Sequence, residues 1–321
     1  MFKKAISVFV MSLAVVSQSY AQAPKVVVDI APLHSLVTQV MDGVGEPDLL
    51  IRPEMSPHSY HLRPSEAKAL SQADIVFWVG EGLTPWLEKP LSSLAGSATQ
   101  IEMMKVEGVT LYDFREGATF EAHEHHDDAR NDHEEEHHEH SKGHEHHHHD
   151  GHDPHVWLDP KNAEVWVNII AKTLSDADSS NAPIYQKNAK ITVSRLHKLS
   201  SKIKQQAKGL EGVKFIVFHD AYQYFEKRFQ LLASGAISIS DASKPSPARI
   251  TDIRDTVKKL GVTCVFTEPQ YNPELVNSIF DNSTVKTIGT MDPLGANLAI
   301  GKDQYDSLLM SMIESLSQCK P

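Results

Sequence analysis

The sequence has few cysteines, a shortage of basic residues and no long apolar segment, and each of these excludes a class of protein. Two cysteines among 321 residues exclude a small scaffold held by many disulfides. Lys and Arg number 31 against 42 Asp and Glu, and the net charge of −11 disfavours binding to nucleic acid or to an anionic membrane surface. Beyond the first 21 residues, no segment approaches the ~20 consecutive apolar residues that span a bilayer. The length and composition predict a globular protein with one large domain or two ordinary ones.

The first 21 residues have the pattern of a secretory signal peptide. Lys3 and Lys4 precede a mostly apolar run at 5–16, and Ser19 and Ala21 place small residues at positions −3 and −1 of a cleavage site. A membrane anchor is the alternative, but the run is well short of the ~20 residues needed to span a bilayer. We predict cleavage after Ala21 and a periplasmic mature protein. Because no cysteine lies near that site, no lipid anchor is expected.

Short runs rich in β-branched and aromatic residues alternate with helical patterns along the rest of the chain. The predicted strands cover residues 26–30, 75–79, 215–218 and 264–267, and the predicted helices include 65–70 and 247–260. Such alternation is typical of α/β units with parallel sheets. The sequence therefore predicts two α/β units, each with a parallel sheet flanked by helices.

Residues 183–209 form a different kind of segment. They contain no internal Gly or Pro, and apolar residues recur close to every 3.6 positions until Gly209. A helix of this length spans about 39 Å. We predict a rigid helix that connects an N-terminal lobe, residues 22–182, to a C-terminal lobe, residues 210–321, with His197 on its surface. One more surface helix of a single domain is the alternative.

The composition changes abruptly between residues 121 and 153. This tract holds 13 of the 19 histidines and 12 acidic residues, against one Arg and one Lys. With two alanines as its only apolar residues it cannot form a core, so we predict a disordered loop. Imidazoles and carboxylates at this density indicate a flexible chelator of zinc, copper or nickel, and a solvated charged linker is the alternative. The histidines are His123, His125, His126, His133, His137, His138, His140, His144, His146, His147, His148, His149 and His152.

Three histidines outside this tract lie in similar settings in distant parts of the chain. His58 lies in a turn-rich loop after the apolar residues 49–51, His155 lies just beyond the tract, and His219 follows the predicted strand at 215–218. Open α/β sheets bind ligands at the carboxyl ends of their parallel strands. Each histidine alone would more often be structural, but together they predict one metal site between two lobes.

Cys264 and Cys319 most simply form one disulfide, because the protein is predicted to enter an oxidising compartment. Cys264 lies in a predicted strand and Cys319 lies near the end of the chain, so the bond would hold a terminal helix that otherwise frays. A two-cysteine metal site is the alternative. It is disfavoured because neither cysteine has a Cys or His partner at ligand spacing.

Several motifs resemble those of one family, the cluster A-I metal-binding proteins of ABC importers. They are Pro-His-Ser-Tyr at 57–60, Asp-Pro-His-Val-Trp-Leu-Asp-Pro at 153–160, Phe-His-Asp-Ala-Tyr at 218–222, Glu-Pro-Gln at 268–270 and Thr-Met-Asp-Pro-Leu-Gly at 290–295. The resemblance extends from Lys25 to Cys319. The His-rich insertion and the placement of the cysteine pair are typical of the zinc branch, the periplasmic zinc-binding proteins of high-affinity zinc importers.

The resemblance implies two α/β lobes joined by one long rigid helix, with the metal held between them. It implies His58, His155 and His219 as ligands, and three imidazoles favour zinc over the harder manganese. Some zinc members carry a carboxylate just before the first ligand histidine, a candidate fourth ligand, but this chain has Pro57 there. Water, Asp292 or a side chain of the His-rich loop remain as the fourth ligand.

The predicted function is the capture of Zn²⁺ as a transported ligand and its delivery to a membrane permease. On this reading the protein is a monomer, with no catalytic activity, no nucleic-acid partner and no membrane anchor of its own. A secreted zinc-dependent hydrolase or hydratase is the main alternative, because three histidines and a water also form a catalytic zinc site. The sequence offers no clear base or nucleophile near the three loops. A zinc-storage or surface protein is the third alternative.

Overall fold

The computed structural model describes residues 23–115, 151–238, 245–271, 273–281, 283, 285 and 287–319. The predicted signal peptide and its cleavage site lie outside these residues, as does the His-rich tract from residue 121 to residue 150.

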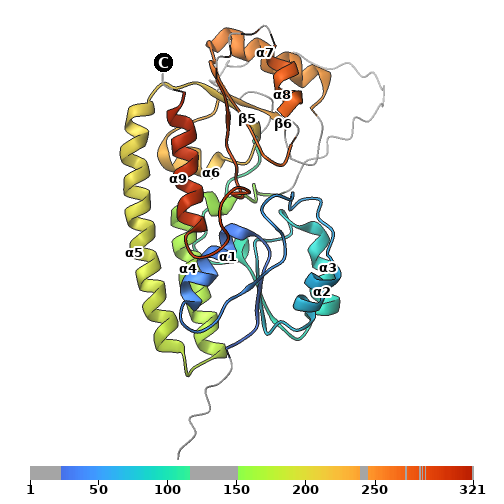
Figure 1. The fold of residues 1–321 in the computed structure, drawn as a ribbon, viewed down its shortest axis with the longest axis vertical. Helices are drawn as coiled ribbons and strands as arrows, with labels where there is room; N and C mark the ends of the chain where they lie inside the picture. Colours follow the sequence, from blue (N-terminus) through green and yellow to red (C-terminus); the bar gives the residue numbers. More distant parts are fainter. Residues whose placement is uncertain are drawn as a thin grey trace, which may run out of the picture.

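The N-terminal lobe contains a parallel four-stranded sheet with the order β2-β1-β3-β4. Its strands are β1 (Val26–Val28), β2 (Asp48–Leu49), β3 (Ile75–Trp78) and β4 (Thr99–Glu102). Its helices are α1 (Ala31–Met41), α2 (Pro64–Ser71), α3 (Glu88–Leu94) and α4 (Pro160–Ala177), with short 3₁₀ turns at Pro85–Leu87, Met103–Lys105 and Val156–Leu158. The helices α2 and α3 lie on one side of the sheet, and α1 and α4 lie on the other (Figure 1).

The C-terminal lobe repeats this arrangement with the strand order β6-β5-β7-β8, again parallel. Its strands are β5 (Phe215–His219), β6 (Gly235–Ser238), β7 (Cys264–Thr267) and β8 (Thr287–Thr290), and its helices include α6 (Gln223–Phe229), α7 (Pro247–Leu260) and α8 (Pro273–Phe280). Gly289 in β8 faces the Phe266 ring so closely that a Cβ there would lie 2.8 Å from a ring carbon. Only glycine fits this approach of strand to ring.

One long helix, α5 (Ala182–Ala207), runs along both lobes, and a 3₁₀ turn at Lys208–Leu210 ends it (Figure 1). Buried apolar residues recur along α5 at helical spacing, and Tyr185, Leu196 and Ile203 are almost fully buried. The last helix, α9 (Gln304–Ser317), packs against both α5 and α1. Helices from the beginning, the middle and the end of the chain therefore pack together. The predicted class, two α/β lobes joined by one long helix, is confirmed.

Within the described part of the chain, no helix has the length and apolar character that crossing a membrane requires.

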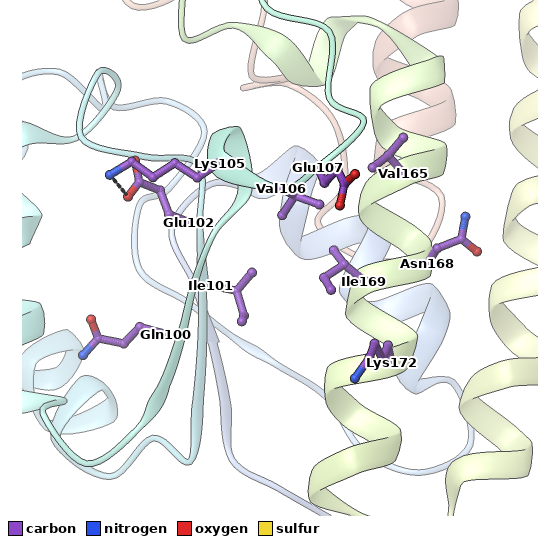
Figure 2. Close-up of a pocket in the computed structure, with 10 residues that line it drawn as sticks. All are labelled: Gln100, Ile101, Glu102, Lys105, Val106, Glu107, Val165, Asn168, Ile169 and Lys172. Carbon is purple, nitrogen blue, oxygen red and sulfur yellow. Dashed lines mark ion pairs between the residues drawn. The ribbon is translucent and has the colours of Figure 1, made fainter.

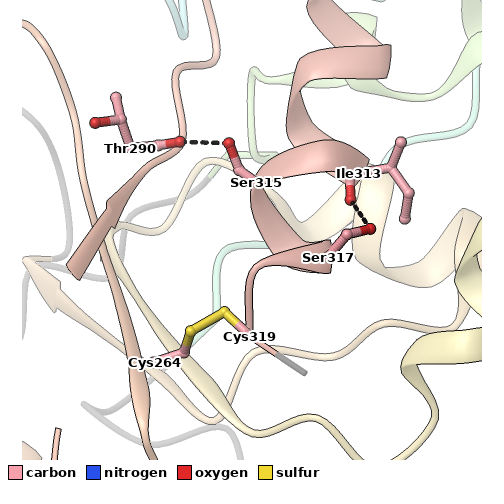
Figure 3. The surroundings of a disulfide bond; sticks show 6 residues. All are labelled: Cys264, Thr290, Ile313, Ser315, Ser317 and Cys319. Atoms are coloured by element: carbon pink, nitrogen blue, oxygen red, sulfur yellow. Dashed lines mark hydrogen bonds between the residues drawn. A yellow bond between two sulfur atoms is a disulfide. The ribbon is translucent and has the colours of Figure 1, made fainter. Parts of the chain in front are cut away.

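The predicted disulfide is confirmed. Cys264, the first residue of β7, is bonded to Cys319, two residues beyond the end of α9, with their Cα atoms 5.7 Å apart (Figure 3). Near it, the Ser315 hydroxyl donates to the carbonyl oxygen of Thr290 at 2.7 Å. The bond therefore fastens the last helix to the sheet of the C-terminal lobe.

Reduction of this disulfide is expected to lower stability substantially. The bond closes a loop with a sequence separation of 55 residues. Loop-closure entropy gives a loss of about 4 kcal/mol, which corresponds to a fall in melting temperature of roughly 6 °C. Thermal unfolding followed by circular dichroism, with and without reductant, measures the shift. The Cys264→Ala/Cys319→Ala variant is the control, because its melting temperature should not respond to reductant; an unchanged melting temperature of the reduced wild type would contradict the expectation.

Candidate metal centre

Three separate segments bring His58, His155 and His219 to the boundary between the lobes. His219 is the last residue of β5, a central strand of the second sheet. His155 comes directly before the 3₁₀ turn at Val156–Leu158, which leads into α4. His58 lies in the loop between β2 and α2. The site thus lies where the carboxyl end of a parallel strand meets the opposite lobe, as expected for an α/β fold.

Local interactions hold each of these segments in place. The carbonyl oxygen of Pro57 accepts a hydrogen bond from Trp86 Nε1 at 2.7 Å, which fixes the loop of His58. Asp159 caps α4 by accepting from the backbone N–H of Lys161 at 2.8 Å. The same carboxylate forms a two-pronged ion pair with Arg228 of α6, at 2.7 and 2.5 Å. The segment of His155 is therefore tied to the C-terminal lobe.

The three imidazoles form a group that could hold a metal ion, with their candidate ligand nitrogens all within 4.8 Å of one another. His155 Nε2 and His219 Nε2 are 3.3 Å apart. The ring centroid of His155 lies 5.6 Å from that of His58 and 5.2 Å from that of His219. His155 and His219 are buried and His58 is half-buried. The structure thus brings together the three histidines that the sequence singled out.

Two buried carboxylates orient these rings. Asp153 Oδ1 lies 2.7 Å from His155 Nδ1, and Glu268 Oε1 lies 2.6 Å from His219 Nδ1. The Tyr222 hydroxyl donates to the same Glu268 oxygen at 3.0 Å. A carboxylate on Nδ1 places the proton there and leaves Nε2 as the lone-pair donor, which is how metal-binding histidines are commonly held. The orientation of both rings therefore directs their Nε2 atoms, which lie 3.3 Å apart, towards the place where a cation could bind.

Burial dominates the acid–base behaviour of these two carboxyl groups. It raises the pKa of Asp153 to about 6, against the lowering effect of the hydrogen bonds from the His155 backbone N–H and from Gln223. Burial also raises the pKa of Glu268, and His219 opposes that shift. A cation held by the two rings would favour the charged carboxylates and oppose both shifts.

The cavity around the histidines is small and partly open. Its volume is about 10 Å³, close to that of one water-sized probe. It can take a metal ion with a ligand as small as water, but not an organic substrate. Its lining residues are Pro57, His58, His155, Trp157, His219, Glu268, Gln270, Tyr271, Pro293 and Leu294.

Asp292, predicted as a possible fourth ligand, is not brought into the histidine group. Its Oδ1 accepts from the Leu294 backbone N–H at 2.9 Å and from Gln270 Nε2 at 3.1 Å, and its Oδ2 accepts from the Ala296 backbone N–H at 2.5 Å. The carboxylate therefore stabilises the turn after β8 and the Gln270 amide.

His152 is the one histidine of the His-rich tract that the described residues include. Its Nδ1 lies 2.9 Å from Asp113 Oδ1, its side chain is about half exposed, and it lies apart from the three-histidine group. The other twelve are outside the described residues: His123, His125, His126, His133, His137, His138, His140, His144, His146, His147, His148 and His149.

Sequence reasoning missed the roles of Asp153, Glu268 and Arg115. Asp153 stands two residues before His155, a spacing that suits a local contact between the two side chains. Glu268 follows β7, the strand next to β5, and no local pattern links it to His219. Arg115 forms ion pairs with Asp220 and with Glu226 of α6, the latter at 2.8 Å. It therefore anchors the segment before the His-rich tract beside His219.

A larger groove, of about 580 Å³, lies between the edge strand β4 and helix α4 (Figure 2). Ile101, Val165 and Ile169 are among its apolar lining residues, and Lys105 pairs with Glu102 at its rim at 2.8 Å. Within the described residues, no group of His, Cys and acidic side chains with metal-binding geometry lies there. The groove is larger than the histidine cavity, but it lacks the ligands of a metal site among the described residues.

The fold and the site together define a two-lobed metal-binding protein, with a buried histidine group where the lobes meet. Residues 26–319 match the model of the family described as "Zinc-uptake complex component A periplasmic". The chain belongs to this family of solute-binding transport proteins.

Curated relatives agree with this assignment, and a solved structure agrees with the fold. The chain is 43% identical over 306 residues to the high-affinity zinc uptake system protein ZnuA of Brucella abortus (strain 2308), which covers 92% of this chain and 91% of the relative. It is 38% identical over 307 residues to the protein of the same name from Paracoccus denitrificans, covering 93% and 92%. The periplasmic zinc-binding protein TroA from Treponema pallidum shares the fold, with a TM-score of 0.73, 18% identity and coverage of 92% and 98%.

Proposed function

We propose that this protein captures Zn²⁺ in the periplasm and delivers it to the permease of an ABC importer, without catalysis of its own. The observation that carries the proposal is the convergence of His58, His155 and His219 on one small cavity between the lobes. Zinc is the transported ligand, and the three imidazoles are its protein ligands.

The chemistry of the donor set supports zinc. Neutral imidazole nitrogens suit a borderline ion such as zinc, whereas manganese prefers carboxylate, carbonyl and water oxygens. Asp153 and Glu268 face Nδ1 of their histidines, so they raise the basicity of the rings and need not contact the metal. A site made of three oriented imidazoles therefore favours zinc over manganese.

The size of the cavity supports capture over catalysis. A zinc hydrolase needs space for a substrate beside the metal and a base that can reach its water. Here the cavity is about 10 Å³, and Asp153 and Glu268 already accept hydrogen bonds from the ligand histidines. Metal binding and release therefore fit this site better than hydrolysis.

Several contacts hold the lobes together around the site. Trp157 Nε1 donates to the carbonyl oxygen of Pro293 at 2.8 Å, and the ion pair of Arg228 with Asp159 joins α6 to α4. Release of zinc would require His58 and His155 to move away from His219, and the permease would favour that movement. The same proposal includes three further features. They are a signal peptide cleaved after Ala21, a monomeric mature protein and additional metal chelation by the His-rich tract.

Deletion of residues 121–151, with His152 and Asp153 kept, tests this function. The three proposed ligands lie outside the deletion, so we expect one tightly bound zinc ion per chain, fewer weak ones and a preference for zinc over manganese. Native mass spectrometry of the metal-stripped protein, titrated with each metal, measures number and preference together, with the full mature chain as the control. A deletion variant that binds no zinc tightly would mean that the tract supplies a primary ligand.

A further inference from the structure

Gln270 lines the histidine cavity from the C-terminal lobe and also contacts the N-terminal lobe. It lies three residues beyond β7, the strand next to β5, whose last residue is His219. Its Nε2 donates to the carbonyl oxygen of Pro53 at 3.0 Å, in the loop that leads to His58, and to Asp292 Oδ1 at 3.1 Å. Gln270 therefore joins the two lobes at the wall of the proposed zinc site.

These two acceptors fix the orientation of the Gln270 amide. Carbonyl and carboxylate oxygens only accept hydrogen bonds, so the amide nitrogen faces them and Oε1 faces away. Gln270 Oε1 is buried, and no donor among the described residues hydrogen-bonds to it. A buried carbonyl oxygen without a donor costs free energy, so a donor that arrives with a bound ligand would stabilise the complex.

Zinc coordination calls for one more group at this place. Three imidazole nitrogens leave a tetrahedral zinc ion with one open position, which water commonly fills. The space enclosed by the rings and their neighbours is about 10 Å³, so that group is no larger than a water molecule. Zinc polarises the O–H bonds of a bound water and makes it a strong hydrogen-bond donor.

We propose that Gln270 Oε1 accepts a hydrogen bond from a water molecule bound at the fourth position of the zinc ion; this rests on the zinc-capture function proposed above. Asp292 then acts on the Gln270 amide and not on the metal, because its Oδ1 holds Nε2 in place. Pro53 holds the same amide from the other lobe, so the bond to the water forms when the lobes are together. Gln270 thereby links zinc occupancy to the contact between the lobes.

The test compares Gln270→Met with Gln304→Met in the full mature chain. Methionine keeps the length of the side chain and removes the amide in both variants. Gln304 is a matched control: its Nε2 donates to the Leu294 carbonyl oxygen at 2.7 Å, its Oε1 is buried without a donor among the described residues, and it does not line the cavity.

Zinc release is measured by mixing protein loaded with one equivalent of zinc with an excess of chelator. Loss of a charge-assisted hydrogen bond should make Gln270→Met release zinc roughly ten- to a hundredfold faster than the wild type. Gln304→Met should release it at the wild-type rate. Equal rates for Gln270→Met and the wild type would overturn the inference.

A crystal structure of the zinc-loaded wild type gives a second readout, which a purely structural role would not produce. We expect one water oxygen about 2.0–2.2 Å from the zinc ion and within hydrogen-bond distance of Gln270 Oε1. A protein side chain at the fourth position would refute the role of Gln270. Failure of the wild type to bind zinc tightly would instead refute the zinc-capture proposal, so the two failures are distinguishable.

Discussion

Alanine at His58, His155 or His219 is expected to weaken tight zinc binding by at least ~100-fold in each case, because loss of even an outer partner of a ligand histidine costs 10–100-fold. Removal of one of three protein ligands eliminates a strong bond and leaves the ion poorly coordinated. Isothermal titration of zinc into each variant, on the background that lacks residues 121–151, measures the loss without interference from the His-rich tract.

His197→Ala is the matched control for these three variants. His197 lies on α5, its side chain is largely exposed, and its Nε2 contacts only Glu164 among the pairs described, at 3.2 Å. Its replacement should leave zinc affinity unchanged. Wild-type affinity in any two of the three ligand variants would refute the assignment of the site.

Zinc is expected to raise the melting temperature strongly and manganese only weakly. A ligand that binds the folded state alone stabilises it by about 4 kcal/mol at 1,000 times its Kd, or roughly 6 °C for a protein of this size. Differential scanning fluorimetry of the metal-stripped protein, with each metal added separately, measures the two shifts. Equal shifts with zinc and manganese would contradict a site of three imidazoles.

The stabilisation by zinc should fade as the pH falls below about 6, because protons compete with the metal for imidazole nitrogens and a free histidine side chain has a pKa of about 6.5. Protonation of Asp153 also reduces the stabilisation by zinc at low pH. Its pKa is raised from 3.8 to about 6 in the metal-free fold, so the metal-free protein gains stability relative to the unfolded chain as the pH falls through about 6 towards 4. Both effects narrow the gap between the zinc-bound and metal-free melting temperatures. A gap that is undiminished at pH 5 would contradict three-histidine coordination.

The sequence predicted the central strands of both sheets and none of the edge strands. The predicted runs correspond to β1, β3, β5 and β7, each flanked by a strand on both sides. The missed strands are β2, β4, β6 and β8, which lie at the four edges. Central strands are covered on both faces and need a continuous apolar run, whereas edge strands are short and tolerate polar residues and glycine, as in Thr-Gln-Ile-Glu of β4.

In the candidate site, local motifs could be predicted from the sequence, whereas contacts between residues far apart in the chain could not. The three histidines could be predicted because each occupies a recognisable loop or strand end. The contact of His219 with Glu268 joins residues 49 positions apart, and that of Gln270 with Pro53 joins residues 217 positions apart. Such contacts depend on how the lobes pack, so no local pattern encodes them. Asp292 stays a predicted candidate for the fourth ligand, suggested by its family motif, and its oxygens accept from backbone N–H groups and Gln270.

Anomalous scattering at the zinc absorption edge, from crystals of the zinc-loaded protein, is the decisive measurement of where zinc binds. It locates zinc independently of any assumption about the ligands. We expect one strong peak between His58, His155 and His219, with His155 Nε2 and His219 Nε2 about 2.0–2.1 Å from it. A zinc peak elsewhere, with none between these three rings, would refute the proposed site.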